Sequence, residues 1–426
     1  MHYLLPPAEP IDAIKKICML CPTSIQKQYE DAAGDDLKVL IAGAGIAGIS
    51  AAQMLRKDGR HPVLVERNPD DSHPGYMLAL MPMADALIDD LDARTEYRQR
   101  SEPFNRYGLY SHKGKLLRVD SMSDILSRYG DYRGIARGKL LGVLTHDGCP
   151  TTFSTTVSAI TSTENNVQVV LQTGDAITEM MFDLVIIADG IHSDTRKLVL
   201  GDRPVDIADT KWGGWVVWAP EDGNMDLGEE LWGAGFFAGV YPVKGQLGVF
   251  LGGARKDTKA GPAAFVDSIR NKLNTISPRF ESCLQAVTKT VNPYYWSLTD
   301  CRSPQWAFGR TILLGDAAAG FLPTAGIGAG MAMESAWVLT HMLRHARPQN
   351  LASLLRAYEQ SQRPRVEAAQ DTSRQLAKMM FHQSRLLAIL RETLMRVVSI
   401  KVALRPIQKL VAGKPDPEAI VKTLIH

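Results

Sequence analysis

Short apolar runs that end at glycine or acidic positions recur along the chain. Residues 37–42 (LKVLIA), 182–188 (FDLVIIA) and 310–314 (RTILL) are of the kind that forms strands buried on both faces of a parallel sheet. The first run is followed by a glycine-rich turn, a helical stretch and a second strand, HPVLVE, which ends at Glu66. Residues 37–69 therefore predict a βαβ unit of the dinucleotide-binding type.

Other parts of the chain follow different patterns. Residues 151–171 alternate as antiparallel strands do, and residues 106–112 and 115–120 predict a hairpin. Residues 202–304 are rich in Trp, Phe and Gly and indicate an antiparallel sheet, whereas residues from 349 onward have helical periodicity. The expected fold class is α/β: a Rossmann-like nucleotide-binding domain with an inserted antiparallel β-sheet domain and C-terminal helices.

Composition narrows the class of protein. The chain has 426 residues, 45% of them hydrophobic, and a net charge of +2, so we expect a large core and no nucleic-acid partner. The five cysteines are odd in number, and neither a secretory signal nor an apolar run of about 20 residues is present. We therefore expect reduced thiols and a cytoplasmic location. Cys18 and Cys21 could be half of a metal site or a redox pair, but we favour two thiols on a helix face and expect no metal.

The glycine turn after the first strand has the G-x-G-x-x-G spacing. Gly43 permits the tight turn, Gly45 leaves room for a pyrophosphate to approach, and Gly48 lets the helix pack closely on the strand. The free N–H groups at the helix N-terminus favour negative charge there. Glu66 can accept hydrogen bonds from a ribose. The expected binding residues of this unit are Gly43, Ala44, Gly45, Ile46, Ala47, Gly48, Glu66 and Arg67.

Two further segments carry candidate binding residues. The strand FDLVIIA ends at Asp189-Gly190, where ligands of α/β sheets bind, and Ser193 and Arg196 follow, expected one turn apart on the next helix. Arg196 could instead be a solvated helix residue. The strand RTILL ends near Asp316 and leads into a glycine loop and a helix, which suggests an anion site. Arg137 opens another predicted helix, where it could bind a phosphate or be solvated.

The aromatic sheet and the basic tail each allow two interpretations. The aromatic side chains could line a pocket for a flat apolar molecule or simply form a core; they are Trp215, Trp218, Phe236 and Tyr241, with Pro323 nearby in the glycine loop. Residues 385–410 carry six cations against one acid, Glu392. This basic helix could contact an anionic membrane surface or a partner helix, although packing on its own domain with solvated charges is the commoner case.

Three blocks in this order resemble the single-component flavin monooxygenases of the para-hydroxybenzoate hydroxylase type. They are GAGIAG at 43–48, DGIHSDTR at 189–196 and GDAAAGFLPTAGIGAG at 315–330. The resemblance implies an FAD-binding domain made of residues 37–72, 135–201 and 302–346 and a substrate domain made of residues 73–134 and 202–301. An N-terminal arm (1–36) and a C-terminal helical region (347–426) remain outside both.

The resemblance also implies the roles of single residues. The glycines of the first block meet the FAD pyrophosphate, and Glu66 meets the adenosine ribose. Arg137, Asp189 and Asp316 contact FAD, and the backbone from Gly326 through Gly328 to Ala329 faces the flavin ring. The chain has Ala318 where many members of this group have histidine.

The implied activity is FAD-dependent monooxygenation. NADPH or NADH reduces FAD, O2 adds to the flavin as a C4a-hydroperoxide, and one oxygen atom passes to an apolar, aromatic or polyketide-like molecule. No protein side chain is obligatory as a nucleophile, so no catalytic residue is expected from the sequence. The alternatives are a flavin-dependent halogenase, a prenyl-type reductase, and a flavoprotein that sequesters a ligand without catalysis.

Overall fold

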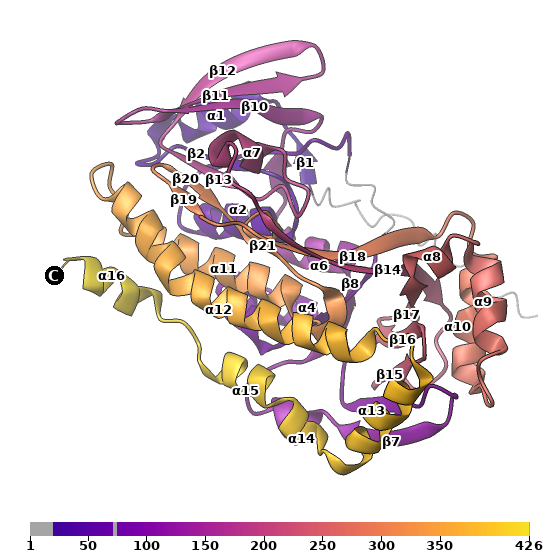
Figure 1. The fold of residues 1–426 in the computed structure, drawn as a ribbon. Coiled ribbons are helices and arrows are strands. Elements are labelled where there is room, and N and C mark those ends of the chain that lie inside the picture. The colour runs from indigo at the N-terminus through magenta and orange to yellow at the C-terminus, as the bar shows by residue number, and fades with distance from the viewer. Residues whose placement is uncertain (1–19, 71–74, 426) are drawn as a thin grey trace, which may run out of the picture.

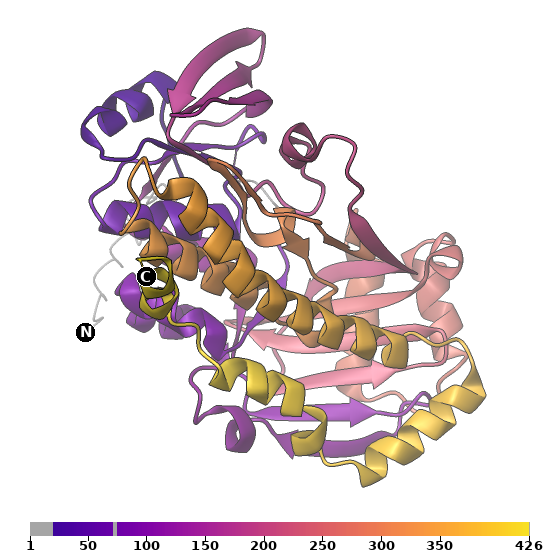
Figure 2. The same cartoon turned by 60° about the vertical axis from the view of Figure 1, so that its left-hand side comes forward.

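The computed structural model describes residues 20–70 and 75–425. Figure 1 shows a unit built on a parallel sheet in its upper half and a unit built on a larger sheet at the lower right. A long helix, α12 (Leu351–Met380), lies along both units, and the same arrangement is visible from the side in Figure 2. The binding residues expected from the sequence belong mainly to the upper unit.

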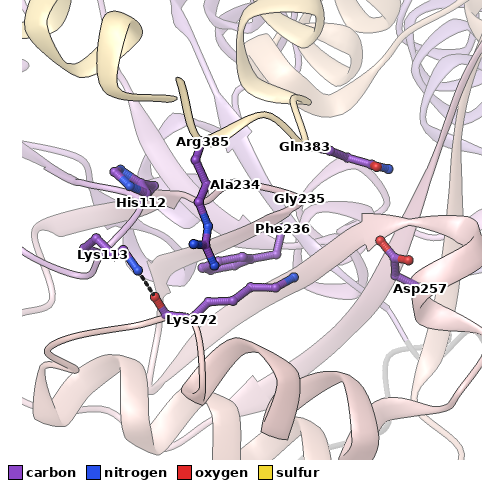
Figure 3. Close-up of a pocket in the computed structure, with 9 residues that line it drawn as sticks. All are labelled: His112, Lys113, Ala234, Gly235, Phe236, Asp257, Lys272, Gln383 and Arg385. Atoms are coloured by element: carbon purple, nitrogen blue, oxygen red, sulfur yellow. Dashed lines mark hydrogen bonds between the residues drawn. The ribbon is translucent and has the colours of Figure 1, made fainter. Parts of the chain in front are cut away.

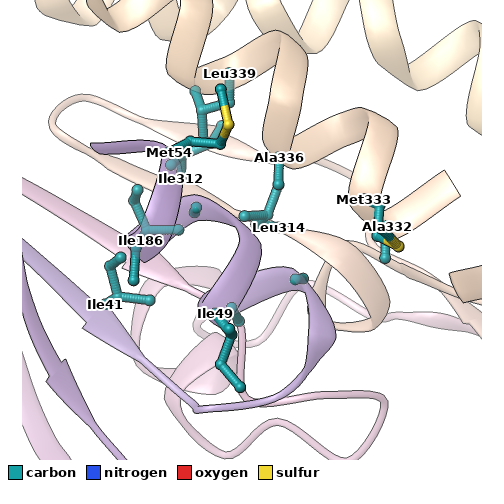
Figure 4. Close-up of a cluster of buried hydrophobic side chains, with 14 of the residues drawn as sticks. Ile41, Ile49, Met54, Ile186, Ile312, Leu314, Ala332, Met333, Ala336 and Leu339 are labelled. Carbon is teal, nitrogen blue, oxygen red and sulfur yellow. The ribbon is translucent and has the colours of Figure 1, made fainter. Parts of the chain in front are cut away.

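The parallel sheet has the strand order β19-β20-β13-β2-β3. Its strands are β2 (Val39–Ala42), β3 (Val63–Val65), β13 (Leu184–Ile187), β20 (Thr311–Leu313) and the short antiparallel β19 (Ala307–Phe308). The three apolar runs therefore form neighbouring buried strands, as predicted. Figure 4 shows how side chains of these strands meet those of α2 (Ile46–Lys57) and α11 (Gly328–Leu343) in one apolar cluster. This cluster fixes the N-termini of both helices at the carboxyl edge of the sheet.

The second sheet has eight strands in the order β21-β18-β14-β17-β16-β15-β6-β7, and all neighbours are antiparallel except β15 and β6. Its strands are β6 (Arg106–Tyr110), β7 (Leu116–Ser121), β14 (Asp206–Ala219), β15 (Leu227–Trp232), β16 (Phe236–Val243), β17 (Gln246–Ala254), β18 (Tyr294–Arg302) and β21 (Ala319–Gly320). The predicted hairpin is β6–β7, and the aromatic region is an antiparallel sheet, as expected. Helices α8 (Arg255–Thr258), α9 (Pro262–Arg270) and α10 (Pro278–Lys289) follow its strands, and α9 and α10 cover one face.

Three small sheets surround the parallel sheet. They are β4 (Met77–Leu80), β8 (Arg133–Ala136) and β5 (Glu102–Pro103); β10 (Thr155–Ser162), β11 (Val167–Thr173) and β12 (Ala176–Phe182); and β1 (Leu20–Pro22) with β9 (Cys149–Thr151). The remaining short helices are α1 (Ile25–Asp31), α3 (Asp85–Asp90), α4 (Arg94–Arg100), α5 (Ser123–Leu126), α6 (Arg137–Leu144) and α7 (Thr195–Leu200).

Residues 20–34 pack against the nucleotide-binding unit, although the sequence analysis assigns them to an added arm. Strand β1 pairs with β9, and the buried amide of Gln28 in α1 donates to the Leu64 carbonyl and accepts from the Leu64 N–H. These bonds satisfy the outer edge of β3. Cys18 lies outside the described residues, but Cys21 lies in strand β1, so the expected helix face is wrong for Cys21.

The C-terminal region is helical, but its basic stretch is not one helix. It divides into α13 (Arg385–Val397), α14 (Ile400–Ala403) and α15 (Arg405–Ala412), and α16 (Pro417–Ile425) ends the described chain. Within the described residues, no helix combines the length and the apolar character that crossing a membrane requires.

Candidate functional site

The glycine turn between β2 and α2 has the geometry that the spacing predicts. Gly43 has a φ of +107°, and a Cβ at this position would lie 2.6 Å from the Ala188 carbonyl oxygen. A Cβ on Gly48 would lie 1.9 Å from the Gly43 carbonyl oxygen, so the helix could not pack on the strand. Gly45 differs, because no atom lies within 4 Å of an added Cβ. The turn therefore leaves open space directly in front of the helix N-terminus.

Glu66 faces this turn from the end of β3. Its Oε2 accepts a hydrogen bond of 2.9 Å from the Ala44 N–H, and its Oε1 accepts one of 2.9 Å from the Asn68 N–H. A carboxylate has about four acceptor positions, so both oxygens keep capacity for further donors. The neighbouring Arg67 side chain is exposed. Ile46 and Ala47 form the first turn of α2.

Asp189 meets the same turn from β13. An added Cβ on Gly43 would lie 2.7 Å from the Asp189 Cα, so the two loops are in contact. Asp189 Oδ2 accepts from the Thr195 N–H at 3.3 Å, whereas its Oδ1 is buried and has no hydrogen-bond partner among the described residues. Gly190 beside it has a φ of +88° and open space around an added Cβ. A buried acceptor without a donor indicates a site for a group that supplies one.

The position of Ser193 and the role of Arg196 differ from the expectation. Ser193 precedes α7 instead of lying on it, and its hydroxyl accepts from the Arg196 N–H at 2.8 Å. Arg196 is buried, so it is not a solvated helix residue. Its guanidinium donates to the Ala317 carbonyl at 2.9 Å and the Ile191 carbonyl at 3.0 Å. Arg196 therefore holds the loop after β13 against the loop after β20.

The loop after β20 brings a third segment to the site. Gly315 has a φ of +59°, and an added Cβ would lie 2.6 Å from the Ala47 Cβ, so this loop contacts the start of α2. The Asp316 carboxylate is open to solvent but is surrounded by protein on most sides, and this desolvation raises its pKa to about 6. Gly326 adopts the left-handed conformation that ends a 3-10 turn, and α11 begins at Gly328 and continues through Ala329.

Tyr76 is a site residue that the sequence analysis did not identify. It lies beside Arg137 and Asp316, and although burial raises the pKa of its phenol, the Arg137 guanidinium opposes that rise. Its carbonyl accepts from the Arg137 N–H at 2.9 Å, and its ring packs on Trp296 of β18 with centroids 5.5 Å apart. Tyr76 therefore connects the nucleotide-binding unit to the large sheet. A single tyrosine in a loop carries no periodic signal, so only the fold reveals it.

The aromatic residues expected to line one pocket lie on opposite faces of the large sheet. Trp215 and Phe236 point into the core against α9 and α10, because alternate residues of a strand face opposite sides. The four aromatic residues therefore do not line one pocket, and Phe236 also lines a separate hollow near Lys113 and Lys272. Trp218 and Tyr241 occupy the other face: Tyr241 contacts Phe104, and Trp218 lies near Met77 at Gly248. Pro323 begins a short 3-10 turn in the loop before α11.

The face of the sheet turned away from α9 and α10 is the better candidate for substrate contact. Its apolar cluster joins this face to the glycine loop through Leu322 and to α12 through Ala377 and Met380. The aromatic members on the sheet are Tyr107, Trp212, Trp232, Phe237, Phe250 and Trp296. These side chains and Tyr76 place an apolar environment beside the segment 315–328.

A buried carboxylate lies on the same face. Glu230 accepts hydrogen bonds from the Tyr107 hydroxyl (2.6 Å), the Tyr241 hydroxyl (2.6 Å) and the Trp232 indole N–H (2.7 Å). Burial raises its pKa, while the three donors oppose the shift. All three donors are neutral, so Glu230 fixes two tyrosines and a tryptophan without an ion pair. No local sequence pattern predicts this group, since its members come from three strands.

Comparison with known proteins identifies the family. A family model described as an FAD binding domain matches residues 36–373. The chain belongs to this family. It is an FAD-dependent monooxygenase of the para-hydroxybenzoate hydroxylase type that uses NADH or NADPH, as its resemblance at the sequence level implies.

Relatives of similar length match over most of the chain. The monooxygenase is 28% identical over 388 residues to 3-hydroxybenzoate 6-hydroxylase 1 of Aquipseudomonas alcaligenes, covering 84% of this chain and 93% of that protein. It is 28% identical over 391 residues to 2-heptyl-3-hydroxy-4(1H)-quinolone synthase of Pseudomonas aeruginosa, covering 88% and 98%. The structure of Klebsiella pneumoniae HpxO complexed with FAD and uric acid has the same fold, with a TM-score of 0.78 at 21% identity, covering 90% and 99%.

The geometry of the monooxygenase fits FAD. Open space before Gly45, the free N-terminus of α2 and the unpartnered Oδ1 of Asp189 lie at one edge of the parallel sheet. The pyrophosphate of FAD suits the open space at the N-terminus of α2, and the hydroxyl groups of FAD suit the unpartnered Oδ1 of Asp189. Together with the loop at Gly315, which contacts Ala47, these segments form one cradle from three parts of the chain that are far apart in sequence.

Proposed function

We propose that the monooxygenase adds one oxygen atom to an apolar, aromatic or polyketide-like small molecule. This molecule binds on the face of the large sheet that is turned away from α9 and α10, called the inner face below. The observation that carries this proposal is the aromatic cluster beside the segment 315–328. Leu322 of that segment belongs to the cluster, and Trp296 of the cluster contacts Tyr76. Relatives named for 3-hydroxybenzoate and for an alkyl quinolone support a flat substrate. Trp218 and Tyr241 stay in the expected lining and Tyr76 joins them, whereas Trp215 and Phe236 lie on the opposite face of the sheet.

FAD binding is divided among the three segments in this proposal. The backbone of Gly43, Ala44, Gly45, Ile46, Ala47 and Gly48 holds the pyrophosphate, and Glu66 and Arg67 lie at the adenosine end. Asp189 and Asp316 accept hydrogen bonds from the hydroxyl groups of the cofactor, and Arg137 supplies a cation beside it. The backbone of Gly326, Gly328 and Ala329 faces the flavin ring. The division into FAD-binding domain, substrate domain and terminal regions given above belongs to the same proposal.

Bound FAD supplies hydride acceptance from NADH or NADPH and activation of O2. The chain contributes binding, charge and exclusion of water. The N-terminus of α11 favours negative charge at the flavin ring, and the apolar cluster around Trp296 keeps water away from the substrate. Tyr76 stays protonated because burial raises the pKa of its phenol, so it acts as a hydrogen-bond donor at neutral pH.

The cytoplasm is the proposed compartment. The described cysteines, Cys21, Cys149, Cys283 and Cys301, are all free thiols, which supports a reducing environment. Contact of the C-terminal helices with a membrane surface is a separate proposal that rests on a different face of the molecule.

The first experiment is the visible spectrum of the purified protein and its bleaching by NADPH without O2, with and without a panel of phenolic and polyketide-like compounds. We expect a yellow protein whose reduction accelerates with one compound, and in air a product one oxygen atom heavier. Product that depends on halide would favour a halogenase, and substrate saturation without O2 would favour a reductase. Ligand binding without NADPH oxidation would favour a sequestering flavoprotein, and protein that takes up no FAD would overturn the proposal.

A further inference from the structure

Helix α13 is inverted relative to an ordinary surface helix. Its charged residues Arg391 and Glu392 are buried, whereas large aliphatic side chains on the same helix are exposed. The exposed fractions are 75% for Leu386, 65% for Leu390 and 83% for Val397. Leu387, Ile389 and Leu394 are also exposed. A surface helix of a globular protein normally buries its apolar stripe, so this helix presents its apolar side outward.

The buried charges hold α13 in this orientation. The Arg391 guanidinium donates to the carbonyls of Met379, Met380 and Trp232 and lies over the Trp232 ring. Glu392 accepts from the backbone N–H of His112 at 2.5 Å and contacts its ring nitrogen at 2.7 Å. Rotating the helix to bury its leucines would break these bonds and expose or strand both charges. The outward apolar face is therefore built into the packing of α13.

Charged side chains line part of the region under the start of α13. Figure 3 shows Arg385 pointing into a hollow, which has a volume of about 210 Å³ and is lined by several separate segments, among them those of Lys113, Lys272 and Phe236. Lys113 donates to the Lys272 carbonyl there at 3.1 Å. This hollow holds the Arg385 side chain, and the leucines of α13 stay exposed within the described residues.

The exposed charges on α13, α14 and α15 themselves are all cations. Arg396, Lys401, Arg405 and Lys409 of α13–α15 are exposed, and none forms an ion pair with any described residue. The one acid between residues 382 and 413 is the buried Glu392. Figure 2 shows α13, α14 and α15 following one another along the outer edge of the molecule. An aliphatic face flanked by cations matches the two layers of an anionic membrane surface.

We propose that α13–α15 dock this enzyme on an anionic lipid membrane. The leucines of α13 enter the boundary between headgroups and acyl chains, and the four cations contact the acidic headgroups. A second copy of the chain fits less well, because pairing the same face by a two-fold axis would bring both sets of cations together. This inference does not depend on the substrate or on the reaction.

The test is flotation of the full-length FAD-loaded protein with vesicles of phosphatidylcholine alone and vesicles that contain about one third phosphatidylserine. We expect strong flotation with the anionic vesicles, weaker flotation with neutral ones, and a decrease as salt is raised. Leu386→Ser with Leu390→Ser should reduce the bound fraction about tenfold or more, because both side chains lose their burial. Arg396→Gln with Lys401→Gln should reduce binding to anionic vesicles only.

The matched control is Ile177→Ser with Val291→Ser, two aliphatic residues that are 71% and 86% exposed in β12 and after α10. This variant should float like the wild type. Equal flotation of the wild type and the leucine variant would overturn the proposal, as would wild-type protein that binds neither vesicle. A wild-type dimer that becomes a monomer in the leucine variant, with no vesicle binding by either, would assign the face to a second copy instead.

Discussion

At the scale of single residues, the turn between β2 and α2 contains one glycine that the fold requires and another that leaves room for the cofactor. Gly48 has a neighbour that an added Cβ would strike, whereas Gly45 has open space around it. The motif therefore requires glycine at these two positions for two different physical reasons. Substitution by alanine distinguishes them.

We predict that Gly45→Ala folds like the wild type but binds FAD at least about tenfold more weakly, because the new methyl group occupies the space left for the pyrophosphate. Gly48→Ala should lower the free energy of unfolding by about 1–3 kcal/mol even without FAD, because the helix must move away from Gly43. Urea unfolding of the FAD-free protein and FAD titration by flavin fluorescence measure both effects. Equal instability of the two variants would contradict this division.

Asp316 predicts a pH dependence of FAD affinity. Its pKa is raised to about 6 in the cofactor-free protein. Hydroxyl groups of FAD that donate to the carboxylate favour its ionised form, so binding lowers this pKa and releases a proton below pH 6. Affinity should therefore be full above about pH 6 and fall by up to about tenfold for each pH unit below it. Asp316→Asn should bind FAD more weakly but lose this slope, and an unchanged slope would assign it to another group.

At the scale of elements, α12 holds the two units together through a buried ion pair. Arg374 donates to both oxygens of Asp300 on β18, at 2.7 and 2.9 Å, and Asp300 is fully buried. The apolar end of the same helix packs on the inner face of the large sheet through Ala377 and Met380. One helix thus fixes the sheet relative to the FAD cradle.

We predict that Arg374→Leu lowers the free energy of unfolding by about 3–5 kcal/mol, because the Asp300 carboxylate is left buried without its cation. Combining it with Asp300→Leu should restore at least half of the loss, since no charge then remains buried. Arg356→Leu, on an exposed position of the same helix, is the control and should change stability by less than about 0.5 kcal/mol. Denaturant unfolding of the four proteins tests this. No recovery in the double variant would show that packing, rather than the unpaired charge, causes the loss.

At the scale of the whole molecule, the FAD cradle joins segments around residues 45, 189 and 316, so cofactor binding acts on the entire fold. FAD at about one hundred times its dissociation constant should raise the free energy of unfolding by about 2.7 kcal/mol. Thermal unfolding followed by tryptophan fluorescence should show a higher midpoint with FAD for the wild type and at most about half of that shift for Gly45→Ala. A wild-type protein that binds FAD with no change in midpoint would show that the cradle is not coupled to global unfolding.

Much of the nucleotide-binding unit could be predicted from the sequence because its signals are local. A buried parallel strand is a continuous apolar run, and the turn after it requires glycine at fixed spacing, so Gly43, Gly48 and the strand ending at Asp189 were visible without tertiary structure. The position of Ser193 was missed by two residues, since the boundary of a short helix depends on its cap. The buried state of Arg196 was missed because one of its two carbonyl partners, Ala317, lies on a loop far along the chain.

Strand order and side-chain orientation were decided only in three dimensions. Trp215 and Trp218 are three residues apart in one strand and therefore face opposite sides, which an enrichment in tryptophan does not reveal. Tyr76 joins two units through contacts with residues from distant segments. In α13, the sequence determined an amphipathic basic helix, but the bonds of Arg391 and Glu392 decided that its leucines face outward. Local sequence determines where elements form and where a cofactor phosphate binds, whereas long-range packing decides which side chains are left to meet a substrate or a membrane.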